Sequence, residues 1–173
     1  FNLRVAVHAF TPEGIRGAVA AGADTVEHGL VCDEDLAELA KQNNTWFVPT
    51  AYCSWISLRP RYTLTQPPSE VTLLDYWFSY LEESFPSHLE SGLSVLPGTD
   101  AGSAPCSFDD YVHELVFLAA RWHIPPSTVL RAATLDAAEV LGRSSDYGSI
   151  APGKLACIVV SSENPLENLA TLR

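Results

Sequence analysis

Short apolar runs and amphipathic stretches alternate along the first half of the chain. Residues 4–8 and 24–28 are both rich in apolar and β-branched residues and both end in a histidine, and residues 11–22 between them carry helix signals at both ends. Thr11 suits the N-cap of a helix, and Gly22 suits its left-handed end. Because a strand–helix–strand crossover joins parallel strands and is almost always right-handed, we expect the two runs to be parallel strands.

The rest of the chain repeats this alternation. The expected elements are a helix over 33–44, a strand over 46–50, a long aromatic and proline-rich loop over 51–68, a helical stretch over 69–92 interrupted near Pro86, a strand over 93–100, helices over 109–123 and 125–141, and a strand over 155–160. Four βα units amount to half of a (β/α)8 barrel, so we expect an α/β fold. Residues 1–147 would form the half-barrel, and residues 148–173 would return into a second domain.

Three polar residues end predicted strands. His8, His28 and Asp100 each close an apolar run, and the carboxyl ends of parallel strands meet at the edge where α/β barrels carry their chemistry. A single histidine at a strand end is more often structural, but two at equivalent positions together with a carboxylate favour a function. Two imidazoles and one carboxylate suit zinc or another borderline divalent metal.

Composition and charge limit the classes of partner. The 173 residues are 47% hydrophobic and 18% charged, as in ordinary globular domains. A formal net charge of −11 argues against nucleic acid and anionic membrane surfaces as partners, but it leaves a small-molecule substrate open. No apolar run approaches the roughly 18 residues of a membrane-spanning helix.

The four cysteines are scattered and form no C-x-x-C pair. We therefore expect neither a disulfide framework nor a cysteine-ligated zinc site, and a reducing, cytoplasmic location is favoured. Cys157 lies inside the apolar run 155–160 and is expected to be a small buried hydrophobic residue.

Six short motifs follow one another at characteristic spacing: Val-His-Ala at 7–9, Glu-His-Gly at 27–29, Gly-Thr-Asp-Ala-Gly at 98–102, His-Glu-Leu at 113–115, Ala-Ala-Thr at 132–134 and Gly-Ser-Ile-Ala-Pro-Gly-Lys at 148–154. In this order the chain resembles, from end to end, the C-terminal half of the amidohydrolase superfamily, in the branch of imidazolonepropionase and the metal-dependent Xaa-Pro and Xaa-Arg dipeptidases. The resemblance implies that the four strands are barrel strands five to eight, and that the final segment enters a small β-sandwich.

The resemblance also implies roles for individual residues. His8 and His28 would be metal ligands on strands five and six, and Asp100 on strand eight would be both a ligand and the proton shuttle. Glu27 precedes a ligand on its strand and is expected to be structural. The implied reaction is hydrolysis of an amide C–N bond in a small molecule, dipeptide or cyclic amide, with one or two divalent ions, zinc being the most fitting.

Four further residues are candidates for contact with the substrate. Arg59 and Arg61 could hold a substrate carboxylate as guanidinium forks do, Tyr52 could line the pocket, and His113 could reach its mouth. Each has a plainer interpretation as a loop charge or a packing residue. Deamination of a heterocycle and a catalytically inactive barrel that serves as an interaction scaffold remain alternative functions.

The chain contains no methionine and opens just before a strand. We therefore expect it to be the C-terminal part of a longer protein. The superfamily's paired histidines on strand one and its carboxylated lysine on strand four would precede Phe1, which leaves the number of metal ions open. The missing half of the barrel would come from the rest of a longer chain or from a homo-oligomeric partner.

Overall fold

A computed structural model of the protein describes residues 3–62, 79, 81–82, 85–90, 92–102 and 105–173, and at positions 58–62, 87, 88 and 90 it describes the backbone alone. Three parallel strands form its sheet in the order β1 (Ala6–Ala9), β2 (Thr25–His28) and β3 (Trp46–Val48). The first two strands therefore pair side by side in parallel, as their sequence pattern predicts.

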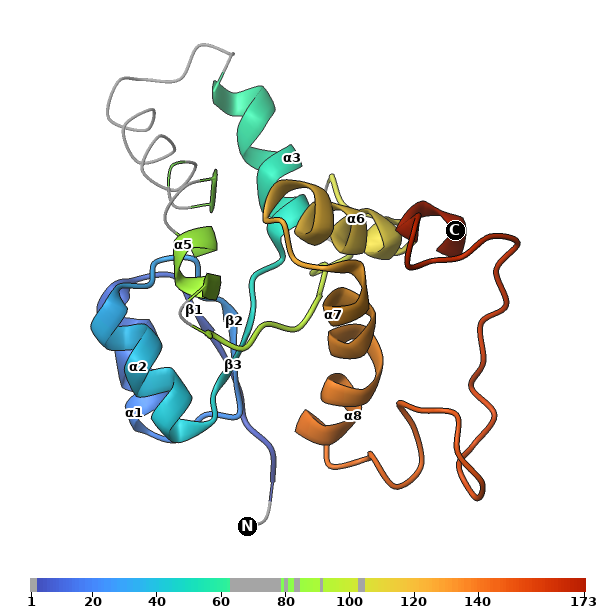
Figure 1. The fold of residues 1–173 in the computed structure, drawn as a ribbon. Coiled ribbons are helices and arrows are strands. Elements are labelled where there is room, and N and C mark those ends of the chain that lie inside the picture. Colours follow the sequence, from blue (N-terminus) through green and yellow to red (C-terminus); the bar gives the residue numbers. More distant parts are fainter. Residues whose placement is uncertain (1–2, 63–78, 80, 83–84, 91, 103–104) are drawn as a thin grey trace.

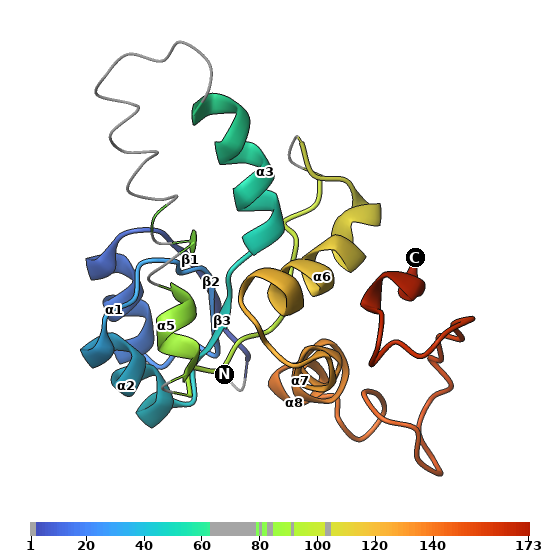
Figure 2. The same cartoon turned by 45° about the horizontal axis from the view of Figure 1, so that its top comes forward.

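Helices flank the sheet on both sides. In chain order they are α1 (Pro12–Ala20), α2 (Glu34–Asn43), α3 (Ala51–Tyr62), α5 (Phe85–Glu90), the 3-10 turn η2 (Phe108–Asp110), α6 (Tyr111–Arg121), α7 (Pro126–Arg131), the π-helical turn η3 (Ala132–Asp136), α8 (Ala137–Val140) and the 3-10 turn η4 (Leu169–Leu172). Figures 1 and 2 both show α1 and α2 together on one side of the strands and α6, α7 and α8 on the other. None of the helices in the described part of the chain has both the length and the apolar character needed to cross a membrane.

The first two helices begin and end where local signals predict. The Thr11 side chain accepts a hydrogen bond from Gly14 N at 3.1 Å at the start of α1, and Asp33 accepts one from Leu36 N at 2.7 Å at the start of α2. Asn44 ends α2 in the left-handed conformation with φ 55°. Such caps satisfy backbone groups that a helix cannot pair internally. The predicted helices over 109–123 and 125–141 are also present, the second one continuous through the π-helical turn η3.

The prediction of a loop over 51–68 is wrong for its first part, because Ala51–Tyr62 forms the helix α3. Residues 63–68 lie outside the described residues. Most of the helical stretch predicted over 69–92 also lies outside them, but α5 covers Phe85–Glu90, with Pro86 in its first turn. Residues 83–84 lie outside the described residues, so the interruption expected near Pro86 stays a prediction. A proline is tolerated there because the first amides of a helix have no internal acceptor.

The fourth predicted strand, over 93–100, is reduced to a single parallel bridge between Phe47 and Val95. Phe47 N donates to Ser94 O at 2.9 Å, and Leu96 N donates to Phe47 O at 2.8 Å. Pro49 explains why the pairing stops there. The next bond of the ladder would need an N–H at residue 49, which is a proline and has none.

The strand predicted over 155–160 does not form in this structure. These residues have no regular secondary structure, and Leu155, Ile158, Val159 and Val160 are exposed. A strand gains its stability from pairing with a neighbour, and none of the strands in the described part of the chain pairs with this segment. Cys157, expected to be buried, is also exposed.

Candidate functional site

The two strand-end histidines lie against each other. The parallel register pairs Ala9 with His28 and His8 with Glu27, so both imidazoles leave the sheet at its carboxyl edge. His28 Nε2 lies 3.0 Å from His8 Nδ1, and the rings meet edge to face with centroids 4.5 Å apart. Glu27 accepts a hydrogen bond from Thr25 Oγ1 at 2.6 Å, which agrees with a structural role for that carboxylate.

His28 is held on several sides. Its side chain is buried, the Phe10 ring stacks on it at 4.5 Å, and its Nδ1 lies 2.9 Å from Thr50 Oγ1. Burial, followed by the neighbouring His8 imidazole, lowers the pKa of His28, and the Asp100 carboxylate opposes this effect. The ring is therefore biased toward its neutral form, the form in which an imidazole can bind a metal ion.

The geometry of the histidine pair fits two ligand positions of a metal site. Zinc holds each imidazole nitrogen about 2.0–2.1 Å away, so two ligands of a tetrahedral ion lie about 3.3 Å apart. The 3.0 Å between His28 Nε2 and His8 Nδ1 is close to that spacing. Asp100 ends the segment that pairs with β3, and the charge of its carboxylate acts to raise the pKa of His28. Within the described residues, however, no three His, Cys, Asp or Glu side chains are grouped so that they could hold a metal ion, and Asp100 as third ligand stays a prediction.

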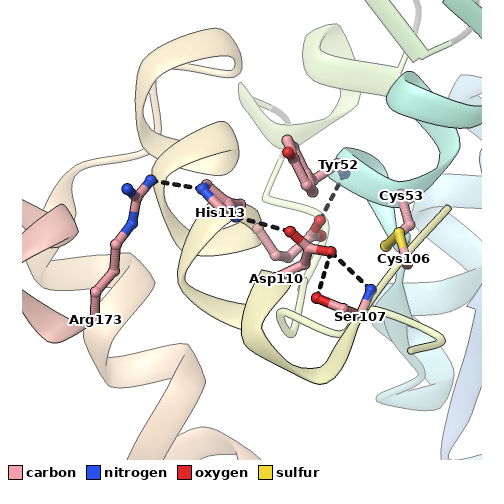
Figure 3. Close-up of polar contacts among 8 residues, drawn as sticks. Tyr52, Cys53, Cys106, Ser107, Asp110, His113 and Arg173 are labelled. Carbon is pink, nitrogen blue, oxygen red and sulfur yellow. Dashed lines mark hydrogen bonds and ion pairs between the residues drawn. A yellow bond between two sulfur atoms is a disulfide. The ribbon is translucent and has the colours of Figure 1, made fainter. Parts of the chain in front are cut away.

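Two of the candidate substrate residues lie together. The ring of Tyr52, in the first turn of α3, stacks on that of His113 in α6 with centroids 5.0 Å apart. His113 Nδ1 lies 2.9 Å from Asp110 Oδ1, and the Arg173 guanidinium contacts Nε2 on the other side of the ring (Figure 3). Because a guanidinium can only donate, Nε2 accepts and Nδ1 donates to Asp110. The other two candidates, Arg59 and Arg61, lie in α3, but their side chains are outside the described part of the structure.

Glu114 is a buried carboxylate to which the His-Glu-Leu motif by itself assigns no role. It is fully buried in α6, and its two oxygens accept hydrogen bonds from Ala51 N at 3.0 Å and Tyr52 N at 2.6 Å. Burial raises the pKa of Glu114 to about 7, against the effect of the two amide donors. The signal available in the sequence is a charged residue on the inward face of an amphipathic helix, next to Leu115 and four residues before Leu118.

Cys53 and Cys106 form a disulfide, with Cα atoms 5.7 Å apart, which corrects the expectation that the chain has none. The spacing hides the pair, because the two cysteines are 53 residues apart in the sequence and only the fold brings them together. Cys53 lies in α3, and Cys106 lies in the segment that follows Asp100. The bond therefore ties the start of α3 to the segment that leaves the candidate site (Figure 3).

Parallel strands with helices on both sides define an α/β protein, and the two histidines make the carboxyl edge of its sheet the candidate site. Residues 1–172 match the model of the Amidohydrolase family, and the chain belongs to this family. The resemblance in the six motifs is thereby confirmed at the level of the superfamily.

Individual relatives agree with the branch. Ochratoxinase of Aspergillus niger is 28% identical over 170 residues, which are 97% of this chain and 34% of that protein. Imidazolonepropionase of Shouchella clausii (strain KSM-K16) is 36% identical over 74 residues, which are 42% of this chain and 16% of that protein. The crystal structure of a Xaa-Pro dipeptidase with bound methionine in its active site matches with a TM-score of 0.87 and 28% identity, over 98% of this chain and 41% of that one.

The chain spans about a third of the length of the ochratoxinase that it matches. The dipeptidase structure is likewise matched over less than half of its length, which is consistent with part of a barrel. The assignment of the strands to barrel positions five to eight, and the boundary between residues 147 and 148, stay predictions.

Proposed function

We propose that the intact protein hydrolyses an amide C–N bond of a small molecule, dipeptide or cyclic amide. The observation that carries the proposal is the histidine pair, with ring nitrogens 3.0 Å apart at the carboxyl edge of the sheet, in a chain of this family. The names of the relatives support the choice of bond, since they include a Xaa-Pro dipeptidase and an ochratoxinase.

In this proposal His8 and His28 would hold a divalent ion, most fittingly zinc because imidazole is a preferred zinc ligand. When bound, such an ion lowers the pKa of a water molecule from 15.7 to about 7 and polarises the scissile carbonyl. Asp100 would take the proton from the attacking water as the water oxygen bonds to the carbonyl carbon. Asp100 would then deliver that proton to the amide nitrogen, and the C–N bond would break to release an amine and a carboxylic acid.

Substrate recognition is proposed for residues around the start of α3. Tyr52 and His113 present stacked rings there, and the Arg173 guanidinium lies against His113. Arg59 and Arg61 would add a preference for a free carboxylate. The partner of the site is thus a small molecule rather than a macromolecule.

The test is the nearly isosteric change Asp100→Asn in the intact protein. We expect kcat to fall by roughly 10²- to 10⁴-fold, the usual contribution of a positioned proton-transfer group, with the fold intact and bound metal measured in parallel. Asp109→Asn is the matched control, because Asp109 is an exposed carboxylate of the 3-10 turn η2. Unchanged kcat in a folded Asp100→Asn variant would exclude Asp100 as the proton shuttle, and wild-type protein without metal or hydrolysis would point to the scaffold alternative.

A further inference from the structure

We propose that Thr50 is a positioning residue that fixes the ring tautomer of His28, so that Nε2 is the nitrogen presented to His8 and to a bound ion. The tautomer assignment stands on the hydrogen bonds of Thr50. Its consequence for metal binding rests on the proposed function. Thr50 is buried just beyond the end of β3, and its hydroxyl oxygen lies 2.9 Å from His28 Nδ1.

The direction of that hydrogen bond follows from the single proton of the Thr50 hydroxyl. Oγ1 donates to the carbonyl oxygen of Pro49 at 2.7 Å, which can only accept. The remaining contact of Oγ1, with Ser54 Oγ, is longer at 3.5 Å. Because a hydroxyl has one proton and two acceptor sites, Oγ1 is left as an acceptor toward His28. Nδ1 must therefore carry the hydrogen, and Nε2 carries the lone pair.

The backbone places the hydroxyl where it can do this. Thr50 has φ 49°, an uncommon conformation for a β-branched residue. The two amides that follow it, of Ala51 and Tyr52, both donate to the buried Glu114 carboxylate, at 3.0 and 2.6 Å. Glu114, a residue of α6, thus holds the backbone directly after Thr50. This contact helps to fix the orientation of the Thr50 side chain at the edge of the sheet.

The consequence concerns metal binding. With Nδ1 engaged by Thr50, the only ring nitrogen of His28 that can bind an ion is Nε2, which lies 3.0 Å from His8. Partners that accept from the outer nitrogen of a ligating histidine set its orientation, and their loss typically lowers metal affinity or activity by about 10- to 100-fold. We expect a loss of that size in zinc affinity when the Thr50 hydroxyl is removed.

The experiment compares Thr50→Val, which keeps the shape and removes the hydroxyl, with Thr50→Ser, which keeps the hydroxyl. Thr45→Val is the matched control. Thr45 is a buried threonine directly before the first residue of β3. Its Oγ1 donates to the backbone carbonyl of Ala23 at 2.8 Å and not to a histidine. The first readout is the long-range ¹H–¹⁵N spectrum of the histidine rings in the metal-free intact protein, under conditions where His28 is neutral, with its signals assigned by their loss in His28→Gln. The second is the dissociation constant for zinc.

We expect wild-type, Thr50→Ser and Thr45→Val proteins to show His28 protonated at Nδ1 and to bind zinc with similar affinity. Thr50→Val should lose that tautomer preference and bind zinc roughly 10- to 100-fold more weakly. A wild-type His28 protonated at Nε2, or a Thr50→Val variant with an unchanged ring spectrum and zinc affinity, would overturn the inference. If wild-type protein bound no zinc, the proposed function would fail, while the ring spectra would still decide the role of Thr50. The wild-type spectrum also decides it if Thr50→Val does not fold.

Discussion

Three residues at the carboxyl edge of the sheet share an uncommon backbone conformation. His28, Thr50 and Asp100 have φ values of 67°, 49° and 53°, and none of them is a glycine. Such conformations cost of order 1–3 kcal/mol each and persist only where the surroundings enforce them. All three strained residues lie at the same edge of the sheet, and backbone strain of this kind clusters at functional sites. The strain therefore supports the choice of this edge as the candidate site.

At the same scale, Glu114 gives a prediction for the pH dependence of stability. Its folded pKa is raised from 4.5 to about 7 by burial, so the folded protein binds one proton more than the unfolded chain between these values. The stabilising contribution is complete below pH 4.5 and is lost as the pH rises through 7. We predict that the free energy of unfolding of wild-type protein declines in this range by at most about 1.4 kcal/mol per pH unit relative to Glu114→Gln.

Urea unfolding of the intact protein at a series of pH values measures this difference. Below pH 4.5, where the contribution of Glu114 is complete, Glu114→Gln should be less stable than wild type by about 1–3 kcal/mol, because an amide can accept from only one of the two α3 amides and leaves the other buried without a partner. This difference should shrink as the pH rises through 7. Glu38→Gln is the control, since Glu38 is an exposed partner of Lys41 with a lowered pKa. Parallel pH curves for wild-type and Glu114→Gln protein would contradict the prediction.

Among the elements, those with local caps could be predicted from the sequence. The helices α1 and α2 start at Thr11 and Asp33, whose side chains reach amides three residues ahead. The helix α3 could not be predicted, because its first amides are held by Glu114, which is 63 residues away from Ala51. A cap supplied by tertiary contact leaves no local pattern.

The residues of the candidate site also divide into those that the sequence predicts and those that it does not. His8 and His28 could be found because each ends an apolar strand and parallel pairing brings strand ends together. Thr50 could not be found, because its role depends on a left-handed backbone and on the proton of one hydroxyl. The strand predicted over 155–160 has the right composition, but composition says nothing about whether a neighbouring strand is present to pair with it.

The disulfide between α3 and the segment after Asp100 gives a prediction at the scale of elements. Peptide mapping without reductant should recover Cys53 linked to Cys106. The double variant Cys53→Ser/Cys106→Ser should be less stable by about 2–4 kcal/mol, because the cross-link restricts the unfolded chain, and wild-type protein in reductant should match it. Cys157→Ser, which alters an exposed free thiol, should change nothing. Recovery of both cysteines as free thiols would contradict the prediction.

At the scale of the whole molecule, the chain exposes surfaces that proteins normally cover. In the described residues β1 pairs only with β2, and the segment at Val95 pairs only with β3, so both outer edges of the sheet are open. The exposed apolar side chains of the C-terminal segment include Ile158, Val159 and Val160, which are 57%, 75% and 90% exposed. Open edges and apolar segments favour association with other chains.

We therefore predict that residues 1–173, expressed by themselves, associate with one another and do not hydrolyse amides efficiently. Closing an eight-stranded barrel needs every strand paired on both sides, and this chain matches only 41% of a related dipeptidase structure. Zinc binding should be weak rather than absent, because His8 and His28 keep the spacing of two ligands, whereas catalytic zinc needs three protein ligands and their supporting partners. Light scattering, zinc content and amide hydrolysis of this chain, compared with the intact protein, measure the three expectations. A monodisperse monomer with stoichiometric zinc and ordinary turnover would contradict the prediction. It would show that residues 1–173 suffice for catalysis and that the open sheet edges need no other chain to cover them.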